Sequence, residues 1–152
     1  MLRVDGLAAA IAALVLVQSA AAQTFVPSHP THPLAREWFS YTSNAVVPSD
    51  REGRYRYAVS CAAKANLHQM ALRLRPPTDF QSTLGPFAAN EAATLGRQQT
   101  QFNNDMDNEF VRVRNMLADY QAHYPAQAGE ATPLLRDMVM SCVEAVGRAR
   151  AG

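Results

Sequence analysis

Cys61 and His68 lie in the stretch "YAVSCAAKANLHQMAL", residues 57–72, and both residue types bind metals and haem iron. In a helix they would share one face, but two turns, about 10.5 Å of rise, would separate them. That is too far for two short side chains to bind one ion easily. Covalent haem attachment would need a C-x-x-C-H run, which the sequence lacks. We predict that His68 packs in the core or at its edge, with a haem or metal ligand as the alternative.

Two further histidines, His29 and His32, stand in the proline-rich run "TFVPSHPTHP", residues 24–33. Their spacing is found in many metal sites, but a structural zinc site needs about four ligands. The prolines remove backbone donors and favour extended structure. Residues 23–33 are therefore predicted to form a flexible, solvated arm. Weak metal binding by the two histidines is the alternative.

Cys61 and Cys142 are the two cysteines of the chain. Each falls in the middle of a predicted helix, on its apolar side. An even cysteine count in an oxidising compartment favours a disulfide, because thiols there are oxidised in pairs. We predict a Cys61–Cys142 bridge, with two buried free thiols as the alternative.

Oxygen ligands are concentrated in "NNDMDNE", residues 103–109, but the run lacks the glycine of an EF-hand loop. The run is better explained as the polar face of a helix. Asp105 and Glu109 should then be solvated and ineffective as acid–base groups. Arg112 and Arg114 are interpreted as solvated surface, together with Arg73 and Arg75. The sequence contains no G-x-S-x-G, H-E-x-x-H or glycine-rich phosphate loop, so no catalytic residue and no cofactor are expected.

The start of the chain has the pattern of a secretory signal peptide. Arg3 precedes the apolar run Leu7–Val17, and small residues stand before a cut ahead of Gln23. The alternative, a membrane anchor, would need roughly 20 apolar residues. We predict removal of residues 1–22, no integral membrane segment afterwards, and a periplasmic or secreted protein. The alanine-rich leader and the nearly exclusive use of arginine as the basic residue suggest a bacterial source.

Residues 34–152 are predicted to form a single all-α domain, a four- or five-helix antiparallel bundle held by one disulfide. Apolar periodicity predicts helices over 34–45, 54–74, 86–124 and from Pro133 onwards, with Thr132 as the last helix's N-cap and Pro86 at a helix start. Cys61 and His68 lie on one of two apolar stripes of the second helix, which indicates a helix packed between neighbours. A helix over 86–124 would be roughly 58 Å long, so a bend or break near Gly96, or an exposed overhang, is expected.

The formal net charge of +1 lacks the basic excess typical of nucleic-acid binders. The expected function is a non-enzymatic protein-binding or inhibitor/immunity-type module, with another envelope or secreted protein as partner. The alternative is a ligand, haem or metal carrier that uses the bundle interior or the histidine-containing arm. Trp38, Phe39 and Tyr41 are weak candidates for the contact surface, because aromatic residues are enriched at interfaces. A core anchor is the alternative for Trp38.

Overall fold

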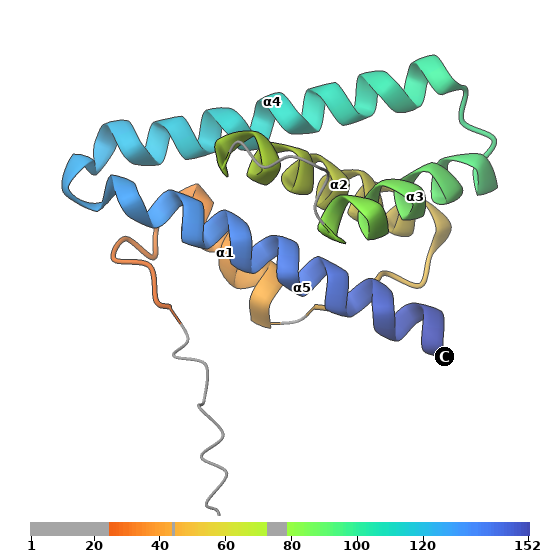
Figure 1. Ribbon diagram of the computed structural model, residues 1–152, viewed down its shortest axis with the longest axis horizontal. Helices are drawn as coiled ribbons and strands as arrows, with labels where there is room; N and C mark the ends of the chain where they lie inside the picture. Colours follow the sequence, from red (N-terminus) through yellow and green to blue (C-terminus); the bar gives the residue numbers. More distant parts are fainter. Residues whose placement is uncertain (1–24, 44, 73–78) are drawn as a thin grey trace, which may run out of the picture.

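The computed structural model describes residues 25–43, 45–72 and 79–152, which form five α-helices and no strand (Figure 1). The helices are α1 (Pro33–Ser43), α2 (Arg51–Leu72), α3 (Asp79–Thr94), α4 (Gln99–His123) and α5 (Ala131–Ala151), with a 3₁₀ helix η1 (Pro125–Glu130) before α5. The all-α prediction is confirmed. The predicted signal peptide, residues 1–22, and the predicted end of the second helix near Arg75 lie outside the described residues.

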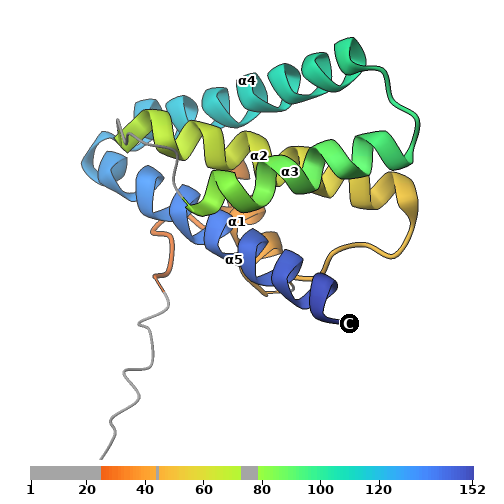
Figure 2. The same ribbon diagram turned by 45° about the vertical axis from the view of Figure 1, so that its right-hand side comes forward.

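Helix α2 lies at the centre of the fold and packs against α3, α4 and α5. Its side chains are buried on almost every side between Ala58 and Ala65, as its two apolar stripes predict. In both views α2 and α3 lie side by side and run in opposite directions, and η1 joins α4 to α5 at one end (Figures 1 and 2). Helix α1 packs mainly on α5 and touches α4.

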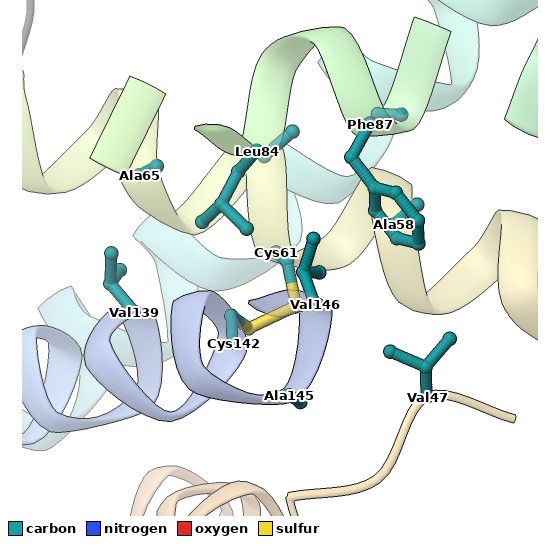
Figure 3. Close-up of a cluster of buried hydrophobic side chains, with 12 residues drawn as sticks. Val47, Ala58, Cys61, Ala65, Leu84, Phe87, Val139, Cys142, Ala145 and Val146 are labelled. Atoms are coloured by element: carbon teal, nitrogen blue, oxygen red, sulfur yellow. A yellow bond between two sulfur atoms is a disulfide. The ribbon is translucent and has the colours of Figure 1, made fainter. Parts of the chain in front are cut away.

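A disulfide joins the two halves of the chain in the first hydrophobic core. Cys61 of α2 and Cys142 of α5 are fully buried and bonded, with their Cα atoms 5.8 Å apart. Leu84 and Phe87 of α3 pack around them with Val139 of α5 (Figure 3). The predicted bridge is confirmed. Because it links residues 81 apart in the sequence, it should stabilise the fold by about 4–5 kcal/mol in the chain-entropy model.

A second core holds α1 against α4 and α5. Leu34 and Trp38 of α1 pack with Val113 and Tyr120 of α4 and with a group of α5 residues. The predicted apolar seam of α4 faces the cores along its length, through Phe102, Met106, Phe110, Val113, Leu117 and Tyr120, and Tyr124 after the helix end continues it. Periodicity alone therefore identified the buried side of the longest helix.

The predicted break near Gly96 is present. Gly96 has a φ of +67°, the left-handed region that glycine adopts without the steric cost of a Cβ atom. It lies between the end of α3 at Thr94 and the start of α4 at Gln99. The two helices can thus pack against α2 from different sides instead of forming one overlong rod.

Two predicted helix starts are wrong. Gly85 and Pro86 lie inside α3, which begins at Asp79. Burial of Leu84 and Phe87 offsets the cost of an interior proline, and Gly85 has no Cβ atom to clash with the proline ring that follows it. Thr132 is not an N-cap, because η1 leads directly into α5 and Glu130 holds the N-cap position.

Candidate functional site

Lys64, the only lysine in the sequence, is completely buried in the middle of α2. Its Nζ atom lies 2.7 Å from Oε1 of Glu37 on α1 and 3.7 Å from Oε1 of Glu109 on α4. It also donates a hydrogen bond of 2.6 Å to Oγ of Ser60, one turn earlier in α2. The ring of Tyr41 lies 4.2 Å from the ammonium nitrogen. One cation thus ties three helices together.

Arg112 of α4 closes this arrangement from the solvent side. Its Nη1 and Nη2 donate to the two carboxylate oxygens of Glu37, both at 2.7 Å. Its Nε and Nη2 donate to the two oxygens of Glu109, at 2.8 and 2.7 Å. The guanidinium is therefore held in its plane by two bidentate carboxylates. Two cations, Lys64 and Arg112, balance two anions, so the cluster has no net formal charge.

The cluster keeps both carboxyl groups ionised. Burial would raise the pKa of Glu109, but hydrogen bonds from Arg112 and Ser60 and the charges of Lys64 and Arg112 hold it at about 2. Burial opposes the same interactions at Glu37, whose pKa is also lowered, by Arg112 and Lys64. Hydrogen bonds that Arg112 donates to the two carboxylates raise its pKa despite its burial. The prediction that Glu109 is an ordinary solvated carboxylate is therefore wrong.

The hydroxyl of Ser60 is fully engaged within the cluster. It donates to Oε1 of Glu109 at 2.6 Å and accepts hydrogen bonds from Lys64 and from the Tyr41 hydroxyl, the latter at 2.7 Å. A serine hydroxyl has one proton and two lone pairs, so every hydrogen-bonding position is used. A Ser–Lys pair on one helix face resembles a nucleophile with its base, but an acyl-transfer nucleophile needs a free lone pair and a base without a proton. The geometry here suits a rigid support.

An open cleft of about 600 Å³ runs between α2 and α4, and Ser60, Glu109 and Arg112 of this cluster form part of its wall. Its lining combines tyrosines, arginines and carboxylates, namely Tyr41, Tyr55, Tyr57, Arg56, Arg97, Arg112, Glu52, Asp105 and Glu109, with Ser60, Val59, Gln101 and Asn108. A second open cleft of about 510 Å³ lies between α1 and α4. Tyr41 and Arg112 line both clefts, and Glu37 of the cluster lines the second one. Arg112 thus stands at the junction of the two hollows.

Most of the lining is held in place by its neighbours. The hydroxyl of Tyr55 donates to Asp105 at 2.6 Å, and burial and this bond raise the pKa of Tyr55. Nη2 of Arg97 donates to both carboxylate oxygens of Glu52, at 2.8 and 3.0 Å, and the guanidinium covers the Tyr55 ring at 5.2 Å. Such a surface is already organised before a partner arrives, which lowers the ordering cost of binding.

The structure places His29 and His32, the weak metal-ligand candidates, apart from the cleft. His29 stacks on Tyr124, with ring centroids 3.5 Å apart. His32 is buried, its Nε2 atom lies 2.9 Å from Asp119, and its Nδ1 atom accepts the backbone N–H of Leu34. The histidines therefore dock on α4 and at the start of α1, in contrast to the solvated arm that was predicted. Within the described residues, no three histidine, cysteine, aspartate or glutamate side chains are arranged to hold a metal ion.

His68 lies in the interior, as predicted, with 3% of its surface exposed. Its ring is near Phe80 of α3, and neither ring nitrogen has a hydrogen-bond partner among the described residues. Burial and the charge of Arg136 lower its pKa, so the neutral form is favoured. A lone neutral imidazole between helices is consistent with a packing role.

The predicted aromatic contact residues separate into three environments. Trp38 is buried, and its indole N–H donates to Asp137 of α5 at 3.2 Å. This placement agrees with the core-anchor alternative for Trp38. Phe39 is 64% exposed on α1. Tyr41 is half-buried, lines both clefts and donates to Ser60. Of the three, Tyr41 is the one that the structure brings to the cleft.

Sequence reasoning missed the cluster of Lys64, Glu37, Glu109 and Arg112. A signal was present, because Lys64 stands among alanines in a helix that is apolar on two faces, so that it has little polar surface to occupy. A buried lysine requires a carboxylate partner. The sequence does not identify that partner, because Glu37 and Glu109 belong to two other helices and reach Lys64 only when α1 and α4 pack around it.

Comparisons of the chain with protein-family models, curated proteins and solved structures find no match. Within the described residues, no helix combines the length and apolar character needed to cross a membrane.

Proposed function

We propose that this protein is a non-enzymatic binding module of the periplasm or of the secreted compartment, and that it binds another envelope or secreted protein through the α2–α4 cleft. The signal-peptide pattern and the Cys61–Cys142 disulfide support the compartment. An inhibitor or an immunity-type protein fits this description. The carrier alternative would depend on His68 or on the histidine-containing arm and stays a prediction.

The observation that carries the proposal is the preorganised tyrosine- and arginine-rich lining of the cleft. Tyrosine and arginine are enriched at protein interfaces and at their energetic hot spots. The states of Ser60 and Glu109, the cleft residues whose types could take part in catalysis, support the same conclusion. Ser60 has no free lone pair, and Glu109, with a pKa of about 2, cannot supply a proton near neutral pH. A rigid polar surface whose serine and central carboxylate are already engaged is suited to recognition.

The test compares two substitutions of asparagine on opposite sides of α4. Asn108 lines the cleft, whereas Asn103 is exposed on the same helix outside the lining. Asn108→Arg and Asn103→Arg add the same charge and bulk. Each variant and the wild-type protein would be used to capture partners from the periplasm or medium of the source organism, with quantitative mass spectrometry.

We expect proteins captured by the wild type to be retained by Asn103→Arg and depleted at least tenfold by Asn108→Arg. Circular dichroism and thermal unfolding of both variants control for folding. Equal capture by the two variants would contradict the α2–α4 cleft as the binding surface. Capture of no protein by the wild type, together with a stoichiometric haem or metal in the purified protein, would support the carrier alternative instead.

A further inference from the structure

Arg112 presents an unusual surface at the junction of the two clefts. Four of its five N–H groups point at the carboxylates of Glu37 and Glu109. Its side chain is nevertheless 48% exposed. Because four N–H groups at the edges of the guanidinium meet carboxylates, a ligand in either cleft can contact the group only over its flat face or at the remaining N–H.

The charges around this face decide which ligand it can accept. An incoming carboxylate or phosphate would find nearly all the Arg112 donors occupied and would meet the two negative charges of Glu37 and Glu109. An incoming cation would find both carboxylates already paired, with Lys64 and Arg112. Small ions of either sign therefore gain little at this place.

An aromatic ring has the complementary charge pattern. Its face is negative and its edge is positive. Laid flat on the guanidinium, the ring would put its negative face on Arg112 and its positive edge toward the carboxylates of Glu37 and Glu109. The two carboxylates also fix the plane of the guanidinium, so no side-chain freedom is lost when a ring stacks on it.

The aromatic side chains of the cleft do not already fill this role. Tyr41 has the ammonium group of Lys64 against its ring and lies parallel to Tyr57 at 5.6 Å. The Tyr55 ring is covered by Arg97. Among the described residues, the cation–π contacts involve Arg54, Lys64, Arg97 and Arg150, and none places a ring over Arg112.

We infer that Arg112 is the stacking platform for an aromatic side chain of the partner protein, inserted where the α1–α4 and α2–α4 clefts meet. This inference deepens the proposed function and rests on it. Glu37 and Glu109 act as positioning residues that hold the platform flat. Tyr41, which lines both clefts, forms the wall beside it.

The inference can be tested without the partner by titrating N-acetyl-tryptophanamide into protein labelled uniformly with ¹⁵N, in which the Arg112 Nε–H and the Asn108 side-chain amide are both observed. The Nε–H signal of Arg112 is the readout, because its hydrogen bond to Glu109 should protect it from exchange. A stacked indole should shift this signal upfield by its ring current, with saturation in the range of about 1–10 mM expected for such a small ligand. N-acetyl-leucinamide is the matched aliphatic probe.

We expect a saturable upfield shift of the Arg112 signal with the tryptophan probe and a shift at least tenfold smaller with the leucine probe. In Arg112→Lys, which keeps the charge and loses the flat face, perturbation of the Asn108 side-chain amide by the tryptophan probe should fall at least fivefold. No upfield shift in the wild type would overturn the inference, even if the variant does not fold. Equal shifts with both probes would also overturn it.

The outcomes separate this inference from the proposed function. Loss of partner capture in Asn108→Arg with no aromatic response at Arg112 would leave the cleft as the binding surface and reject the stacking platform. A clear aromatic response in a protein whose partner capture is unaffected by Asn108→Arg would reject the proposed α2–α4 binding surface instead.

Discussion

Replacement of Lys64 by methionine should destabilise the protein strongly. The side chain is completely buried between Glu37 and Glu109, so its removal leaves two partly buried carboxylates, 15% and 18% exposed, with one cation, Arg112. Breaking a buried ion pair costs about 3–5 kcal/mol. Because Arg112 still pairs with both carboxylates, we expect the lower end of that range, about 3 kcal/mol.

Urea unfolding followed by circular dichroism measures this loss. With a denaturant slope of about 1–3 kcal/mol per molar urea, the midpoint should fall by about 1–3 M. Arg56→Met on the same helix is the control, because Arg56 is mostly exposed and its 3.4 Å pair with Glu52 lies at the surface. Its free energy of unfolding should change by less than about 1 kcal/mol.

A double variant isolates the charge imbalance from the loss of packing. Lys64→Met combined with Glu37→Gln removes one charge of each sign, and we expect it to be more stable than Lys64→Met alone. Two results would refute the reasoning. One is a loss below about 1 kcal/mol for Lys64→Met, and the other is a double variant whose loss is the simple sum of the two single losses.

Three further predictions concern the rest of the fold. Replacing both Cys61 and Cys142 by alanine should lower the free energy of unfolding by about 4 kcal/mol, measured by urea unfolding, and an unchanged midpoint would contradict the bridge's role. The stabilisation from Glu109 should be complete above about pH 4.5 and lost as the pH falls toward about 2, because its pKa is lower in the folded state. The full difference corresponds to about 3 kcal/mol, which screening at the half-exposed Arg112 should reduce to about 1–2 kcal/mol. The folded-state carboxylate is still mostly ionised at pH 3, so roughly half of this loss falls between pH 5 and pH 3. Unfolding at these two pH values should show it in the wild type and a smaller loss in Glu109→Gln, and equal losses would count against it. Gly96→Ala should lower the free energy of unfolding by about 1–2 kcal/mol. Gly147→Ala, in a helix with open space at the Cβ position, should be neutral or stabilising by up to about 1 kcal/mol. Thermal unfolding compares the two variants, and a Gly96→Ala variant as stable as the wild type would contradict the left-handed turn.

The helices and their buried faces could be predicted because they depend on local periodicity. The seam from Phe102 to Tyr120 along α4 and the apolar side of α5 around Cys142 follow directly from residue spacing. The disulfide followed from the even cysteine count and the predicted oxidising compartment. The break at Gly96 followed from a length argument combined with the conformational freedom of glycine.

The start of α3 could not be predicted from local signals. Gly85 and Pro86 are typical of helix ends, and the fold overrides them because Leu84 and Phe87 pack in the core beside the disulfide. Tertiary burial of two large side chains outweighs a local preference of a few kcal/mol.

The candidate site was the least predictable part of the chain. Glu109 and Arg112 look like one turn of an exposed helical face, and Glu37 belongs to a different helix. Their electrostatic environment exists only after α1, α2 and α4 dock around Lys64. A hydrophobic pattern identifies which side of a helix is buried, but it does not identify which charged groups of other helices will meet there.

Site-specific photo-crosslinking in the source organism tests the central claim most directly. A benzophenone amino acid would replace Asn108, which lines the α2–α4 cleft, and in a parallel strain Asn103, which is exposed outside it. The account predicts a discrete protein adduct after irradiation from position 108 and none from position 103. Adducts of equal yield from both positions, or an adduct from position 103 alone, would contradict the cleft as the surface through which this protein works.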